Sequence, residues 1–106
     1  MKIEQLQKNA ALATSLLKVM ANEIRLLTLC ELLDGEKSVQ EMEQKIGISQ
    51  STLSQHLAIL RRERLVTTRK SAQFVYYAIA SEEAISVMQA LYGAYCQPKR
   101  KSKIAA

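Results

Sequence analysis

One stretch of the sequence decides the fold: Ser49-Gln-Ser-Thr-Leu-Ser-Gln-His-Leu-Ala-Ile-Leu-Arg61. Ser49 is a favourable N-cap, because a serine hydroxyl accepts a hydrogen bond from a backbone N–H group left unpaired at a helix start. Leu53, Leu57 and Leu60 then recur at the i, i+4 and i+7 spacing of an apolar stripe along a helix. The stretch therefore predicts an amphipathic helix that packs its leucines into a core.

The polar face of this helix is suited to the edges of DNA bases. Small neutral side chains that form hydrogen bonds approach bases without burying a charge. Upstream, a short helical pattern over residues 39–46 ends at Gly47-Ile48, which predicts a tight turn. A short helix, a turn and a capped helix with a polar outer face form a helix-turn-helix motif. We therefore expect DNA contacts from Ser49, Gln50, Ser51, Thr52, Ser54, Gln55, His56 and Arg62.

The rest of the chain supplies further helices with recognisable starts. Asn22 caps a helix whose Ile24, Leu27 and Leu32 are expected to point inward. Ser38-Val-Gln-Glu41 has the Ser-x-x-Glu pattern of a capping box and starts the next helix. The predicted helices span 3–20, 23–33, 39–46, 49–61 and 81–95, with a turn at 34–37.

A β-hairpin is predicted directly after the reading helix. Residues 65–69 and 73–79 are rich in β-branched and aromatic side chains, and residues 70–72 between them make the tip. The fold class is thus mainly α with a β-hairpin wing, a winged helix-turn-helix in the order α-α-α-α-β-β-α. Arg69, Lys70 and Gln73 would meet DNA phosphates, which give affinity and register rather than sequence selectivity. The alternative is a solvated basic surface with no ligand.

The charge distribution also favours a polyanionic partner. Residues 1–60 carry six basic and seven acidic side chains, whereas residues 61–106 carry nine basic and three acidic ones, so the whole net charge of +5 lies in the second part. We expect one winged-helix domain over 1–98 and a basic flexible tail over 99–106. No apolar run is long enough for a membrane span and the N-terminus does not resemble a signal peptide, which predicts a cytoplasmic protein.

The first and last helices predict a homodimer. Ile3, Leu6, Ala10, Ala13 and Leu17 follow the alternating spacing of three and four that is typical of a coiled-coil seam. A second apolar strip runs along the same helix, and residues 81–95 are also apolar on two sides. A terminal helix with two apolar faces buries one on its own core and the other on a partner subunit. The alternative is a helix that is buried entirely within one chain.

These elements together resemble the ArsR/SmtB family of dimeric winged-helix regulators of bacteria. The residues that carry the resemblance are Leu-Lys-Val-Met-Ala-Asn-Glu-Ile-Arg-Leu (17–26) and Ser-Gln-Ser-Thr-Leu-Ser-Gln-His-Leu-Ala-Ile-Leu-Arg-Arg (49–62). The similarity covers residues 10 to 96. It implies binding of double-stranded operator DNA and no catalytic residues. The sequence also lacks a Gly-rich phosphate loop and a base–nucleophile pattern, so an enzyme is not expected.

The two cysteines, Cys30 and Cys96, bear on what the protein senses. A cysteine pair in a cytosolic protein suggests redox or metal chemistry rather than a structural disulfide. Metal sites of the family need more thiols, or Asp and His pairs, than these helices offer, so we expect no metal and no cofactor. The sequence around both cysteines resembles the sulfide- and redox-sensing branch of the family, which includes HlyU-type virulence regulators and biofilm growth repressors. This resemblance implies thiol oxidation or persulfidation at Cys30 and Cys96.

Three alternatives stay open for these features. Both cysteines are ordinary small apolar side chains in the first alternative. In the second, the protein is a metal- or metalloid-responsive repressor. In the third, it is a helical interaction module whose basic face meets an acidic protein and never DNA.

Overall fold

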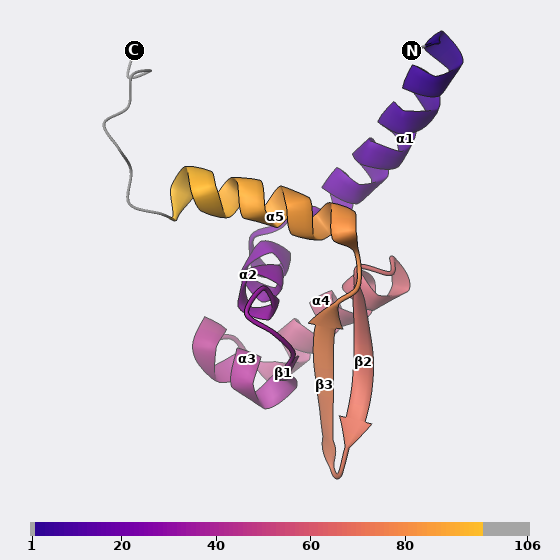
Figure 1. Cartoon of the computed structure of the whole chain (residues 1–106). Helices are drawn as coiled ribbons and strands as arrows, with labels where there is room; N and C mark the ends of the chain where they lie inside the picture. Colours follow the sequence, from indigo (N-terminus) through magenta and orange to yellow (C-terminus); the bar gives the residue numbers. More distant parts are fainter. Residues whose placement is uncertain (1, 97–106) are drawn as a thin grey trace.

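The computed structural model describes residues 2–96 of the 106-residue chain (Figure 1). The predicted basic tail, residues 99–106, lies outside the described residues. The elements in chain order are α1 Ile3–Met20, α2 Glu23–Leu32, β1 Lys37–Ser38, α3 Val39–Ile46, α4 Gln50–Arg62, β2 Val66–Ser71, β3 Phe74–Ile79 and α5 Glu82–Tyr95. The five predicted helices and the hairpin are confirmed, and the chain is a winged helix-turn-helix.

The apolar stripe of α4 is at the centre of the core. Leu53, Leu57 and Leu60 have no solvent-exposed surface. Burying a leucine side chain contributes roughly 1.5–3 kcal/mol, so these three residues are a major part of the stability of so small a core. The other buried apolar residues packed with them are Met20, Leu29, Leu32, Met42, Leu65, Val66, Ala84 and Met88.

One predicted inward-facing residue of α2 is placed differently. Leu27 is 45% exposed, whereas Thr28 and Leu29 are fully buried. Thr28 is tolerated there because its hydroxyl donates a hydrogen bond to the Ile24 carbonyl at 2.8 Å, which satisfies its polar group locally. The prediction that Leu27 points inward was therefore wrong, and Thr28 takes a place in the core instead.

The wing belongs to a three-stranded antiparallel sheet in the order β1-β3-β2. The predicted hairpin tip, residues 70–72, starts two residues too early, because β2 continues to Ser71 and the turn consists of Ala72 and Gln73. Ala72 takes a positive φ of 56°, as tight hairpin turns require. Strand β1 was not predicted, since its two residues, Lys37 and Ser38, are too few for a sequence pattern. It pairs with Tyr76 and Tyr77 of β3.

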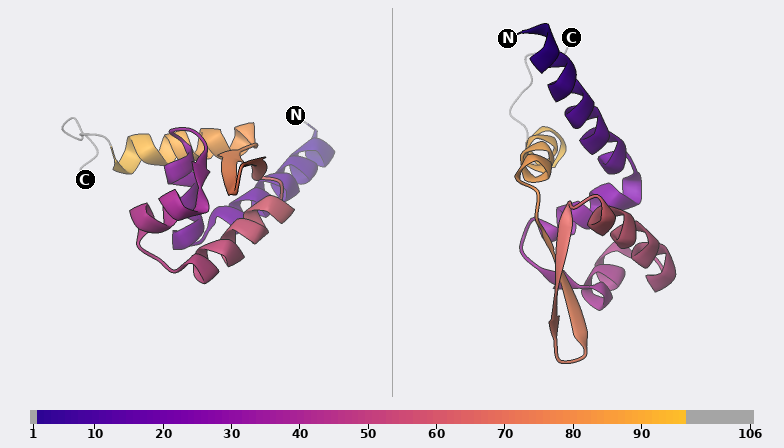
Figure 2. Two further views of the ribbon diagram at one scale, coloured as in Figure 1. Left: turned by 90° about the horizontal axis from the view of Figure 1, so that it is seen from below. Right: turned by 90° about the vertical axis from the view of Figure 1, so that its right-hand side faces the viewer.

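Helices α1 and α5 frame the side of the molecule opposite the wing tip (Figure 1). Helix α5 lies across the top of α2 in Figure 1, and the N-terminal end of α1 extends beyond the other helices (Figure 2). Among the residues of α1, only Leu16, Val19 and Met20 near its C-terminal end pack on the core. Large apolar side chains along the rest of α1 are therefore exposed, with Leu12 at 64% and Ile3 at 60%. Across residues 2–96, no helix is long and apolar enough to cross a membrane.

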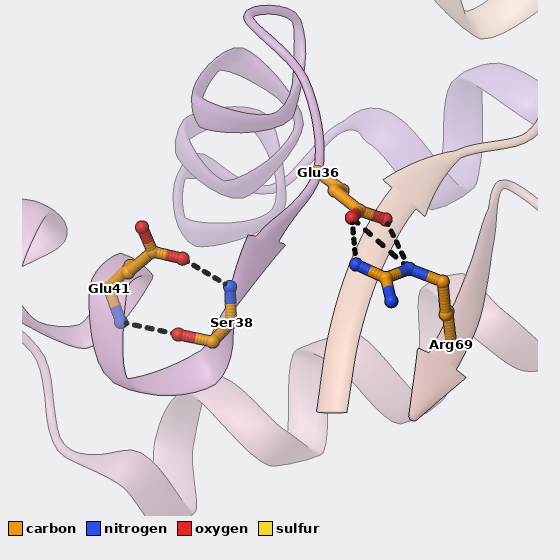
Figure 3. A network of polar contacts seen from close by, with 4 residues as sticks. All are labelled: Glu36, Ser38, Glu41 and Arg69. Carbon is orange, nitrogen blue, oxygen red and sulfur yellow. Dashed lines mark hydrogen bonds and ion pairs between the residues drawn. The ribbon is translucent and has the colours of Figure 1, made fainter. Parts of the chain in front are cut away.

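Capping interactions set the geometry of the helix-turn-helix. The predicted capping box is present: Ser38 Oγ accepts from the Glu41 backbone N–H, and the Glu41 carboxylate accepts from the Ser38 N–H (Figure 3). Helix α3 ends at Gly47, whose φ of 79° lies in the left-handed region. Ser49 then caps α4 by accepting from the Thr52 N–H at 3.2 Å. The turn thus depends on a glycine conformation and two serine caps.

We predict that Gly47→Ala lowers the free energy of unfolding by about 1 kcal/mol or more, because a side chain disfavours the left-handed conformation at this position. Nothing lies within 4 Å of an added Cβ, so the effect isolates the backbone. Urea denaturation at a fixed protein concentration measures it. Gly93→Ala is the control, since Gly93 lies inside α5 without a positive φ and its replacement should leave stability unchanged or raise it. Equal losses in both variants would contradict the prediction.

Candidate DNA interface and thiol pair

The predicted base-reading side chains lie mostly on the exposed face of α4. Its length and caps place the leucine stripe inward, and Gln50, Ser51, Ser54, Gln55 and Arg62 are exposed as a result. These side chains are free to approach a polyanion without unfolding the helix. The structure therefore brings these five predicted residues together on one surface.

Three other predicted residues of this helix are engaged within the protein. Ser49 and Thr52 form the N-terminal cap, where the Ser49 hydroxyl also donates to Thr52 Oγ1 at 3.0 Å. His56 is half-buried on the flank that faces α2, with its Nδ1 3.3 Å from Nη1 of Arg25. Because arginine has only donors, Nδ1 of a neutral His56 must accept, and the ring proton then lies on Nε2. Only that N–H remains for a ligand.

Arg25 joins three helices at this point. Its backbone N–H donates to the Asn22 side chain at the start of α2, and its Nε donates to the Val19 carbonyl near the end of α1. Its guanidinium also contacts His56 on α4. The position of α4 is thereby linked to the corner between α1 and α2. The sequence does not indicate that Arg25 connects these helices, because its partners are up to 31 residues away and no local pattern predicts their contact.

The predicted wing residues divide between two faces of the hairpin. Arg69 pairs with Tyr76 in the ladder and Lys70 with Val75, so strand alternation points their side chains to opposite faces. Lys70 shares a face with Tyr77, which pairs with Thr68 and packs on the core. Gln73 is exposed at the tip. The two adjacent cations therefore point to opposite faces of the hairpin.

Arg69 is held by an ion pair inside the chain. Its guanidinium forms a fork with Glu36, with Nε 3.2 Å from both carboxylate oxygens and Nη2 in contact with Oε1 (Figure 3). It also lies 4.9 Å from the ring centre of Tyr76. The hydrogen bonds from Arg69 hold the pKa of the Glu36 carboxyl below its ordinary value, and those to Glu36 raise the pKa of Arg69. Of the Arg69 donors, Nε and Nη2 are directed at Glu36.

A hollow of about 430 Å³ lies between α4 and the wing. It is lined by Ser54, Ala58, Arg61, Arg62 and Tyr77. Arg61 is exposed, and within residues 2–96 its guanidinium makes no ion pair or hydrogen bond. Arg62 instead lies 3.5 Å from the Glu63 carboxylate. Of these residues, Arg62 was predicted from the sequence, whereas Arg61 and Tyr77 were not. The pair of adjacent arginines could have indicated Arg61. Tyr77 could not have been found, because only the fold brings it close to them.

The two cysteines are free thiols in different surroundings. Cys30 is half-buried in α2 against the core, and Cys96 is exposed at the C-cap of α5. Burial raises the pKa of the Cys30 thiol above its ordinary value of 9.0, and the charges of Cys96, Glu31 and Asp34 raise it further. Helices α2 and α5, which carry or end at the two cysteines, pack against each other. Between residues 2 and 96, no three His, Cys, Asp or Glu side chains cluster as metal ligands.

Comparisons with known proteins place this fold and interface in one family. Residues 22–68 match the family described as bacterial regulatory protein, arsR family. The transcriptional activator HlyU of Vibrio cholerae is 52% identical, over 92% of this chain and 90% of that protein. The biofilm growth-associated repressor of Xylella fastidiosa is 37% identical, over 93% of this chain and 87% of that protein.

The structural similarity agrees with the sequence similarity. A solved structure described as reduced HlyU from Vibrio cholerae superposes with a TM-score of 0.86 at 52% identity, covering 90% of this chain and all of that chain. The similarity thus extends from the helix-turn-helix to α1 and α5. The chain therefore belongs to the ArsR family and is a DNA-binding transcription regulator, not an enzyme.

Proposed function

We propose that this regulator binds a specific operator as a homodimer and that bridging of Cys30 and Cys96 switches its binding. The observation that supports the switch is that two free thiols lie on helices that pack against each other, Cys30 in α2 and Cys96 at the C-cap of α5. The two cysteines are 66 positions apart in sequence, so only the fold brings their helices together. The similar structure described as reduced also favours thiol chemistry.

The exposed apolar face of α1 supports the homodimer. Ile3, Leu6, Leu12 and Leu17 are each about half exposed or more, and so are Tyr92 and Tyr95 of α5. A soluble single chain rarely leaves so much contiguous apolar surface in water, and pairing two copies through α1 and α5 removes it. A two-fold dimer presents two copies of α4, which fit half-sites about one helical turn, ~34 Å, apart on a palindromic duplex.

The exposure of the two thiols suggests the order of the chemistry. Cys96 is exposed, so its thiolate meets the reagent first. With a low-molecular-weight persulfide, Cys96 takes the terminal sulfur and releases the donor thiolate. The Cys30 thiolate then attacks the inner sulfur of the Cys96 persulfide, which forms the disulfide and releases hydrosulfide. With hydrogen peroxide, Cys96 becomes a sulfenic acid and Cys30 displaces hydroxide.

Because the pKa of Cys30 is raised, the small fraction of Cys30 present as thiolate limits the rate of bridge closure. Near neutral pH almost all of Cys30 is protonated, because its pKa exceeds 9.0. The thiolate fraction rises about tenfold for each pH unit below that pKa, and the rate of closure follows it. A bridge would tie α5 to α2, which packs against α4. Bridging therefore shifts the support that sets the spacing of the two recognition helices.

The first prediction from this proposed function concerns base reading by α4. Ser51→Ala combined with Gln55→Ala should weaken binding to an operator duplex, selected from a random library, at least tenfold more than binding to random DNA, because each good base contact contributes ~1–3 kcal/mol. Both side chains are exposed, so the fold is unaffected. Fluorescence anisotropy measures both affinities. Gln89→Ala, an exposed glutamine on α5, is the control. Equal losses on the two duplexes would exclude base reading by this helix.

The second prediction concerns the wing. Lys70→Ala should weaken operator and random DNA equally and lower the salt slope by about one, because one phosphate contact is lost. Arg69→Ala should lower the slope by less, because the Arg69 charge is already balanced by Glu36. Binding titrations over a range of salt concentrations give both slopes. A larger slope change for Arg69 would show that it exchanges Glu36 for a phosphate.

The third prediction concerns the thiols. A persulfide donor should form a Cys30–Cys96 bridge within one chain and release the operator, and closure should speed up about tenfold from pH 7 to pH 8. Mass spectrometry of quenched samples, read beside operator binding, follows both events.

Cys30→Ser and Cys96→Ser are the matched controls for the switch. Each should bind the operator as the reduced protein does and keep binding after treatment. Release of DNA from either treated variant, or treated wild type without an intrachain bridge, would refute thiol switching while leaving operator binding in place.

A further inference from the structure

The hollow between α4 and the wing has the form of an anion site. One wall is the flank of the recognition helix that carries Ser54, Ala58, Arg61 and Arg62, and the opposite wall is Tyr77 of β3. The small side chain of Ala58 leaves room between them. The lining offers a guanidinium fork and hydroxyl groups, and it contains no acidic residue. This is the donor set that a phosphate group accepts hydrogen bonds from.

Charge pairing distinguishes Arg61 from its basic neighbours. Arg62 lies next to Glu63, and Arg69 is held by Glu36 on the other face of the wing. In the described part of the chain the Arg61 guanidinium has no such partner, so its full charge faces the hollow. Its donors are available without the loss of an existing ion pair.

The wing continues this surface in one direction. Tyr77 and Lys70 lie on the same face of the hairpin, because Tyr77 pairs with Thr68 and alternate residues of β2 share a face. The donors therefore run from Arg61 through Tyr77 to Lys70. A row of donors of this kind fits the phosphates along one strand of a duplex better than it fits a compact anion.

DNA geometry places a backbone at this line. A helix in the major groove and a wing beside it are separated by the sugar–phosphate strand that divides the two grooves. We propose that the hollow binds one phosphodiester group of that strand, with the Arg61 guanidinium and the Tyr77 hydroxyl as its donors. This proposal rests on the proposed role of α4 as the base-reading helix and adds a contact that fixes its depth and register.

The two donors give different experimental signatures. Arg61→Gln removes a charge and keeps most of the side chain, so operator and random DNA should both bind more weakly and the salt slope should fall by about one. Tyr77→Phe removes only the hydroxyl, so both affinities should fall about fivefold with no change of slope. Circular dichroism and urea denaturation of each variant confirm that the fold is retained.

Arg64→Gln is the matched control. Arg64 is also exposed and lies three residues from Arg61, but it lines a different hollow, between α1 and α5. Its replacement should leave the salt slope unchanged. A slope that falls equally for Arg61 and Arg64 would mean that only net charge matters, which overturns the phosphate site.

Single uncharged methylphosphonates, placed in turn along the operator backbone, locate the contact. Wild type should lose affinity at several positions, and in each half-site one of them, between the half-site and the adjacent minor groove, should no longer have an effect in Arg61→Gln. If no position loses its effect in this variant, the hollow binds no phosphate. Base reading stands in that case, provided that the Ser51 and Gln55 double variant still loses selectivity. Wild type that binds no duplex would overturn both proposals.

Discussion

Burial of one leucine stripe fixes how the recognition helix is turned. Leu53, Leu57 and Leu60 are completely enclosed, and rotating α4 by a single residue would bring at least one of them into water. Each side chain contributes roughly 1.5–3 kcal/mol on burial, which is comparable to a large share of the stability of a small domain. Everything on the opposite face therefore points outward as a consequence of the core. The direction in which the polar face of α4 points therefore depends on how these leucines pack.

Electrostatics then divides the cations on this surface into two groups. The Glu36–Arg69 pair spans the central strand β3 and joins β2 to the segment before β1, so it braces the wing. Exposed ion pairs contribute little to stability, but a forked arginine–carboxylate contact fixes the relative orientation of the two groups that it joins. Arg61 and Lys70 have no such bracing role. The wing thus uses one arginine to hold its shape, while other cations stay available to a ligand.

Local sequence patterns predicted nearly all the helices, because caps and periodicity act over a few residues. The Ser38–Glu41 box and the Ser49 cap formed as expected. Features were missed where contacts between residues far apart in the sequence determine the structure. Strand β1 exists only because β3 lies beside it, and the hollow beside Arg61 exists only because Tyr77 returns to α4 from the wing. Likewise, nothing local in the sequence indicated that Arg69, which was expected to meet phosphates, would pair with Glu36, 33 residues earlier.

The contact between Arg25 and His56 ties the edge of α4 only weakly to α2. Its N···N distance of 3.3 Å is longer than the usual range of such hydrogen bonds. A displacement of α2 that lengthened it further would leave the imidazole free to rotate about its side-chain bonds. Movement of α2 would thereby change which ring atoms of His56 are available at the edge of α4.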